Sequence, residues 1–212
     1  MKDNAEIRSI VGSLERRAEA NEDVIAIKGT PIVFNQSADI GGWWEETIAP
    51  EAIDDDTLKD VRFLVNHNFK GIPLARSRNN TKNSTMRLVK DENGVNMEAD
   101  LDPKNPTAAE LNSAIERGDV SGMSFAFLVD GDKWDDLDSD YPKRTITHIS
   151  EILEISAVTW PAYEQTSISS RSLESGKQSL ADARKALESA KRKSEKIAEL
   201  NLALERMKKN HE

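Results

Sequence analysis

The positions of proline and aromatic residues divide the chain into two parts near Arg171. All seven prolines lie before this point, and the residues after it include neither proline nor an aromatic side chain. Ala, Leu, Glu, Lys, Arg and Ser make up most of the C-terminal part, and all of these except Ser are strong helix formers. The sequence therefore predicts one long helix over residues 172–212, behind a body of a different fold.

A heptad-like seam runs along this predicted helix, at two positions that lie three residues apart. Its first position holds Leu180, Leu187, Ser194 and Asn201, and its second holds Ala183, Ala190, Ile197 and Leu204. Half of these residues are Ala, Ser or Asn, so a coiled coil built on them would be weak. We expect this segment to associate with other chains; the alternative is a single helix that docks on its own domain or stays free.

The net charge of −9 is unevenly distributed between the two parts. Residues 173–212 carry 10 Lys/Arg and 7 Asp/Glu, whereas the rest carries 19 and 31. A body this acidic lacks the basic surface of a nucleic-acid-binding protein. No apolar run reaches the length of about 18 residues that a membrane span needs, and the N-terminus lacks the pattern of a secretory signal. Cysteine is absent, which excludes disulfides and thiolate catalysis.

The body is predicted to consist mostly of strands. The predicted strands are residues 23–34, broken by Gly29 and Pro31, and residues 61–66, 85–90, 95–101, 121–129 and 144–158. Asp91 to Gly94 reads as the turn of a hairpin, and Val95, Met97, Ala99 and Leu101 alternate onto one face.

One internal helix and one acidic loop complete the body. Pro106 begins the helix, Ala109, Leu111, Ala114 and Ile115 form its apolar stripe, and Gly118 follows it. Residues 130–143 are too polar for the core and predict a solvent-exposed loop. The predicted fold class is α+β, mainly β: a curled mixed sheet or barrel.

His67 is one of three histidines and ends the apolar strand of residues 61–66. A histidine where a buried strand meets solvent is well placed to exchange protons near neutral pH, although many such residues only cap a loop. His211 lies one residue from the end of the charged tail, so we expect no catalytic role for it.

Ser124 follows two glycines, Gly118 and Gly122, and precedes a Phe-Ala-Phe strand. Glycine leaves room for a peptide to approach the hydroxyl, and free backbone amides nearby could face a developing oxyanion. Alternatively the hydroxyl bonds only its own loop.

Glu154 lies within the strongly apolar segment of residues 152–158. A buried carboxylate needs a partner, because burying it alone costs several kcal/mol. That partner is an imidazole that it orients, or an arginine such as Arg144 or Arg171.

Four segments, residues 29–35, 63–68, 117–127 and 153–163, resemble the successive motifs of the prohead (capsid maturation) protease family of tailed phages. The combination of Asn-His-Asn, Gly-Met-Ser-Phe-x-Phe and Glu-x-Ser-x-Val-Thr-x-Pro-Ala-Tyr carries this resemblance. It covers roughly residues 25–171 and implies a fold similar to the herpesvirus assembly proteases, a mostly antiparallel β-barrel with flanking helices.

The resemblance implies that His67 is the general base, Ser124 the nucleophile and Glu154 the acidic residue of the site. The herpesvirus relatives use a second histidine, and His148 is the candidate for that role here. In an unbroken strand His148 would lie about 20 Å from Glu154, at roughly 3.3 Å per residue, so only one of them can orient His67. We expect Glu154 to do so, because it lies within the motif.

We expect residues 1–22 to form an N-terminal segment, 23–171 the protease domain and 172–212 a helical tail. Our hypothesis is that the tail targets the protease into the shell through helix pairing and is later cut away. The expected function is that of a serine endopeptidase without cofactor or metal. It would cut the scaffolding segment of the capsid protein, and itself, inside the prohead in the host cytoplasm. The alternatives are an inactive capsid-assembly or scaffolding protein with a protease-like domain, and a plain oligomerisation module.

Overall fold

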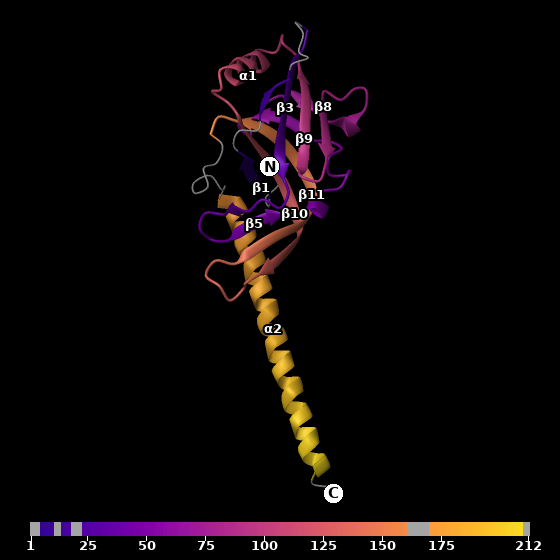
Figure 1. The fold of residues 1–212 in the computed structure, drawn as a ribbon, viewed down its shortest axis with the longest axis vertical. Helices are drawn as coiled ribbons and strands as arrows, with labels where there is room; N and C mark the ends of the chain where they lie inside the picture. The colour runs from indigo at the N-terminus through magenta and orange to yellow at the C-terminus, as the bar shows by residue number, and fades with distance from the viewer. Residues whose placement is uncertain (1–4, 11–13, 18–22, 161–169, 210–212) are drawn as a thin grey trace. The chain divides into compact units, whose positions relative to one another are not determined.

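The computed structural model describes residues 5–10, 14–17, 23–160 and 170–209 (Figure 1). Contacts within the chain divide it into two compact units, residues 1–175 and residues 176–212. Among the described residues, the strands all lie in the first unit, and those of the second unit are helical.

A long antiparallel hairpin, β10 (Gly122–Asp135) and β11 (Lys143–Val158), is the centre of the larger sheet (Figure 1). Strand β1 (Glu6–Ile10) pairs antiparallel with β10, on the side of β10 opposite β11. Two short strands pair in parallel with the two halves of β11: β5 (Glu45–Ile48) with its start and β6 (Arg62–Val65) with its end. The sheet is completed by β4 (Ala38–Asp39) beside β5 and β7 (Ala75–Arg76) beside β6.

The second sheet is antiparallel throughout and has the order β2-β3-β9-β8. Its strands are β2 (Glu15–Arg16), β3 (Ile25–Val33), β8 (Met86–Lys90) and β9 (Gly94–Leu101). The predicted hairpin is confirmed as β8 and β9, and the Asp91 carboxylate caps its turn by accepting from the amides of Asn93 and Gly94. The ladder of β3 shifts register between Gly29 and Ile32, where the sequence predicted a break.

The hydrophobic core lies between the two sheets and takes residues from both. The alternating residues of β9 are all buried, as their period of two predicted, and they pack with Phe125 and Phe127 of β10 and Ile155 of β11. Phe63 of the strand that precedes His67 and Ile155 of the strand that carries Glu154 both belong to this core.

Helix α1 spans Pro106–Glu116, with Asn105 as its N-cap, since the Asn105 side chain accepts from the Thr107 amide. Its buried residues are Ala108, Leu111 and Ile115. The predicted stripe was therefore wrong in placing Ala109 on the buried face, because the helix presents its neighbour Ala108. Two short 3₁₀ helices, Pro50–Ala52 and Arg78–Asn80, lie in connections between strands.

The prediction of a solvent-exposed loop over residues 130–143 was wrong for its first half. Strand β10 continues to Asp135, Trp134 is buried and packs edge-on against Trp44, and Asp132 pairs with Arg144. Polar residues on this stretch are compatible with a strand because Arg144 neutralises the carboxylate that faces inward.

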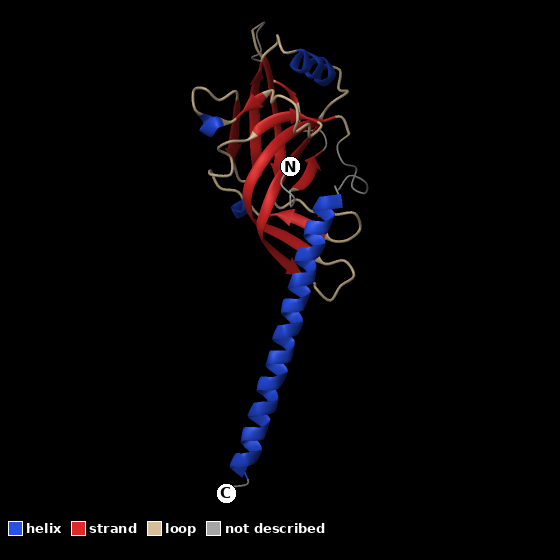
Figure 2. Ribbon diagram, turned by 180° about the vertical axis from the view of Figure 1, so that it is seen from behind, coloured by secondary structure: helices blue, strands red, loops and turns tan. Residues whose placement is uncertain are grey.

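Fold class α+β, mainly β, is confirmed. The strand pairings among the described residues form two separate sheets with strongly curved strands (Figure 2), and no closed barrel is found there. The herpesvirus-like barrel thus stays a prediction.

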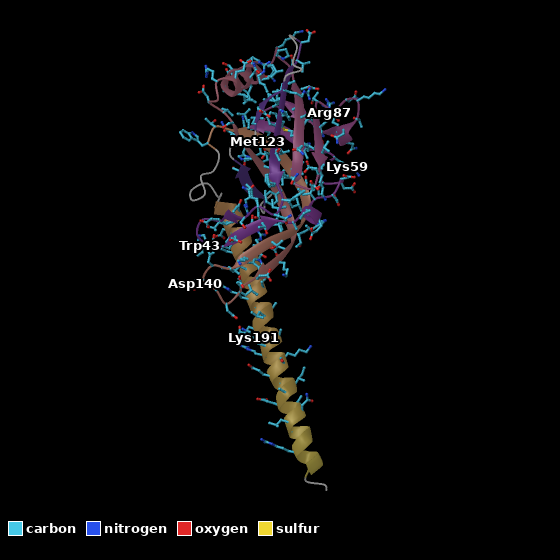
Figure 3. All side chains as sticks on the ribbon, in the orientation of Figure 1. Trp43, Lys59, Arg87, Met123, Asp140 and Lys191 are labelled. Atoms are coloured by element: carbon cyan, nitrogen blue, oxygen red, sulfur yellow. The ribbon has the colours of Figure 1, made fainter. Side chains whose placement is uncertain are left out.

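Helix α2 spans Ser170–Lys209, so the predicted long C-terminal helix is confirmed. Its first residues belong to the first unit, and from Gly176 it forms the second unit. Charged side chains project from it along its length, Lys191 among them (Figure 3), and Ile197, Leu200 and Leu202 are exposed. Among the residues that the structure describes, no helix is long and apolar enough to cross a membrane.

Candidate active site

Strand β10 holds Ser124 between two neighbouring strands, near the labelled Met123 in Figure 3. Ser124 lies opposite Ser156 of β11 on one side and opposite Ser9 of β1 on the other. Its side chain is fully buried, at 0% exposure. The apolar residues around it fix the strand, so the hydroxyl has a defined position.

His67 follows the end of β6 in a turn of unusual backbone geometry. Asn66 and His67 both adopt left-handed conformations, with φ values of 51° and 54°. Such a conformation costs about 1–3 kcal/mol in a non-glycine residue and persists only where the surroundings impose it. Here β11 does so: the Asn66 amide donates to the Ala157 carbonyl at 2.9 Å, and the His67 amide donates to Ser156 Oγ at 3.1 Å.

The Asn66 side chain fixes the same turn from its other side. Its Oδ1 accepts from the Thr159 amide at 2.9 Å, immediately after β11 ends. The His67 turn is therefore bound to the strand that carries Glu154 by backbone and side-chain bonds together.

His67, Ser124 and Glu154 are joined by two hydrogen bonds. His67 Nε2 lies 2.8 Å from Ser124 Oγ, and His67 Nδ1 lies 2.6 Å from Glu154 Oε1. Glu154 is fully buried, whereas the His67 side chain is 20% exposed. The three residues predicted from sequence, which are far apart in the chain, thus form one hydrogen-bonded series.

Ser156 is a member of this group that the sequence analysis did not single out. Its hydroxyl donates to Glu154 Oε2 at 2.5 Å and also accepts from the His67 amide. The Glu-x-Ser spacing could have indicated it, because residues two apart on a strand project from the same face.

Such a series can carry out nucleophilic chemistry. An imidazole bonded to a serine hydroxyl can take its proton, and a buried carboxylate on the other ring nitrogen orients the ring and stabilises its charged form. Among the described residues no group of three or more His, Asp or Glu side chains is arranged to hold a metal ion.

Comparison with known proteins places the chain in a family. Residues 12–179 match the Peptidase_S78 family, described as caudovirus prohead serine protease. The chain belongs to this prohead serine protease family. It is 28% identical over 155 residues to the prohead protease of Enterobacteria phage HK97, an alignment that covers 73% of this chain and 64% of that protein. The chain thus spans less than two thirds of the relative's length. No solved structure matches it.

Two other candidate residues of this prohead protease family member, His148 and Arg144, have partners outside the Ser124–His67–Glu154 series. His148 is exposed on β11 and pairs with Asp130, whose hydrogen bond and charge raise the His148 pKa. Arg144, the alternative partner of Glu154, contacts three other carboxylates. His211 and the side chain of Arg171 lie outside the described residues.

A second group of buried charges, which sequence reasoning missed, lies at the other end of the β10–β11 hairpin. We call it the arginine cluster: Glu6, Arg8, Glu46, Asp132 and Arg144. Arg144 Nη1 lies 2.9 Å from Glu6 and 3.0 Å from Glu46, and Arg8 Nε lies 2.5 Å from Glu46. Burial alone would raise the pKa of Glu46, but Arg8 and Arg144 outweigh it and hold that pKa below its ordinary value.

Proposed function

We propose that the chain is a serine endopeptidase with Ser124 as nucleophile, His67 as general base and Glu154 as the residue that orients His67. The observation that supports it most is the series Ser124 Oγ–His67 Nε2 and His67 Nδ1–Glu154 Oε1, in a chain of the prohead serine protease family. Glu154 is preferred to His148 because His148 pairs with Asp130 instead.

In this mechanism His67 Nε2 takes the proton of Ser124 as the serine oxygen attacks the scissile carbonyl carbon. Glu154 stabilises the resulting imidazolium, and Ser156 holds the second carboxylate oxygen. His67 then donates its proton to the leaving amine, and water hydrolyses the acyl-enzyme. Backbone amides near Gly122–Phe125, or from another loop, would bind the oxyanion.

The substrates proposed are the scaffolding segments of the capsid protein, and the chain itself, inside the prohead in the host cell. The printed name of the HK97 relative, a prohead protease, supports this role. No cofactor takes part in the proposed mechanism. The protease domain is proposed for residues 23–171, with a fold of the herpesvirus assembly protease type, and β1 and β2 of the N-terminal segment add strands to its sheets.

The helical tail is proposed as a targeting segment that pairs with helical scaffolding regions and brings the protease into the shell. Its exposed apolar residues, Ile197, Leu200 and Leu202, support pairing. A chain truncated after Ser175, where the first unit ends, should be packaged into proheads much less than the full chain. Equal packaging of both chains would remove this role.

The function is tested by incubating the wild-type chain and its Ser124→Ala form with the cognate capsid protein, with cleavage measured by intact-mass spectrometry. Ser121→Ala is the matched control, because Ser121 is an exposed serine three residues away. The proposal predicts cleavage by the wild type and the control but not by Ser124→Ala. If none of them cuts the capsid protein or itself under assembly conditions, the inactive assembly protein becomes the better description.

A further inference from the structure

Strand β1 lies directly against the candidate nucleophile. It runs antiparallel to β10 over Glu6–Ile10, with Ser9 opposite Ser124. Ser9 Oγ donates to Ser124 Oγ at 2.9 Å, and Ser124 Oγ lies 2.8 Å from the Arg8 carbonyl oxygen, to which it can donate. The match to the protease family begins at residue 12, so β1 precedes the matched residues.

These contacts oppose catalysis in two ways. A serine hydroxyl has one proton, and the proton that bonds the Arg8 carbonyl is not available to His67 Nε2 at the same time. Ser124 is also fully buried, so a substrate carbonyl carbon cannot reach its oxygen while these contacts persist. The described arrangement is therefore a resting one.

The edge of β10 on the β1 side is the edge that a substrate peptide could pair with. On the other side β11 already pairs with β10 from Gly122 onward. Extended peptides commonly bind by adding a strand to a sheet edge, where main-chain hydrogen bonds give affinity. A peptide on this edge would pass within reach of Ser124, as Arg8 and Ser9 do.

The side chains of β1 explain why it occupies this edge. Glu6 and Arg8 both belong to the arginine cluster, and the Ile7 amide donates to Ser172 Oγ at 2.9 Å, away from β10. The strand is thus held by charges and by the first turn of α2 as well as by its ladder.

We propose that the edge of β10 from Met123 to Phe127 is the binding site for an extended substrate strand, and that β1 is its resident occupant. Substrate binds after β1 leaves this edge, and the departure frees the Ser124 proton for His67. This inference rests on the proposed function, because the edge matters for catalysis only if Ser124 is the nucleophile.

A reversible lock on β1 tests the inference in the full chain, which contains no native cysteine. Because the Ile7 amide points away from β10, Ile7 and Ala126 form a non-hydrogen-bonded pair. Their Cα atoms are then about 4.5 Å apart, within the range of a disulfide. The double variant Ile7→Cys/Ala126→Cys can be compared oxidised and reduced, with Arg87→Cys/Glu98→Cys, an exposed pair across β8 and β9, as the control lock.

The measured rate is that at which an alkyl fluorophosphonate labels Ser124. Oxidation of the Ile7/Ala126 variant should slow labelling at least tenfold, dithiothreitol should restore it, and the control lock should change it less than twofold. Equal labelling rates in the oxidised and reduced forms would overturn the proposed substrate site on the β10 edge. The proposed protease function would still stand. If Ser124 is labelled in neither form nor in the wild type, the proposed function fails, and the strand site with it.

A second variant should change the labelling rate in the opposite direction, and it keeps the inference testable if the cysteine variant folds poorly. Ile7→Pro removes the bond to Ser172 and should loosen β1, so labelling of Ser124 should be at least threefold faster than in the wild type. Unchanged or slower labelling of a folded Ile7→Pro chain would contradict the inference.

Discussion

The two groups of buried charges on the β10–β11 hairpin differ in the kind of basic side chain that their carboxylates face. In the arginine cluster, Glu6, Glu46 and Asp132 face guanidinium groups, whose charge is permanent. At the other end, Glu154 faces the imidazole of His67, a side chain that can accept and donate a proton during catalysis. One hairpin thus carries a fixed ion network, which can hold strands together, and a proton-transfer series, which can do chemistry.

Strand β1 connects the two groups. Its Arg8 guanidinium belongs to the arginine cluster, while its Arg8 carbonyl and Ser9 hydroxyl contact Ser124. The two groups therefore lead to separable predictions: changes at the arginine cluster lower stability without lowering the rate of catalysis, and changes at the other end lower that rate.

The largest expected effect is on catalysis. Glu154→Gln should lower kcat for peptide cleavage about 10³–10⁴-fold, because a neutral amide cannot stabilise the imidazolium and favours the wrong tautomer. His148→Gln is the matched control on the same strand and should stay within twofold. A large loss in His148→Gln with none in Glu154→Gln would reverse the assignment of the third residue.

The next largest effect is on stability. Arg144→Met should lower the free energy of unfolding by about 3–5 kcal/mol in urea titrations, because it leaves Glu6 and Glu46 buried with less positive charge. The exposed Arg87 provides the comparison: Arg87→Met should cost under about 1 kcal/mol. Equal losses in the two variants would show that the cluster is not what holds the hairpin.

Ser156→Ala should have an intermediate effect on catalysis. A hydrogen bond to a charged group contributes about 1.5–3 kcal/mol, so loss of the bond to Glu154 should lower kcat about 10–100-fold and leave KM nearly unchanged. Ser150→Ala, at an exposed site on the same strand, should leave both constants unchanged. A change in KM alone would assign Ser156 to substrate binding.

The smallest effect concerns pH. Because the folded-state pKa of Glu46 lies below its ordinary value of 4.5, Glu46 contributes stability that is present above that value. The contribution is lost as pH falls through the lowered pKa. Urea unfolding from pH 7 to pH 3 should therefore show a steeper loss in the wild type than in Glu46→Gln, and parallel curves would contradict this pairing.

Local patterns predicted much of the fold and the candidate site. The alternation in residues 95–101, the Asp91–Gly94 turn and the helix after Pro106 depend on neighbours in sequence, and the structure contains all three. His67, Ser124 and Glu154 were candidates on local grounds, and only the resemblance to the prohead protease family joined them in one site; in the structure their side chains lie together.

What the sequence did not reveal depends on contacts across the sheet. Residues 130–135 looked too polar for a strand. The sequence alone does not show that the inward-facing Asp132 pairs with Arg144 of β11. The role of β1 was equally hidden, because nothing in residues 6–10 indicates that Ser9 pairs with Ser124. Ser156 was missed because its hydroxyl matters only through two partners, one of them in the turn after β6.

The most direct test of the difference between the two groups is a paired measurement on Glu154→Gln and Glu46→Gln, with cleavage rate and thermal unfolding recorded for each. Both changes remove one buried carboxylate charge from the same sheet. We predict that Glu154→Gln loses cleavage and keeps its unfolding temperature within a few degrees. We predict that Glu46→Gln unfolds at clearly lower temperature but, while folded, cleaves at least as fast as the wild type, because loss of the Arg8–Glu46 pair loosens β1. If instead both variants lose cleavage and stability to the same degree, the two groups are one structural network, and the division of roles is wrong.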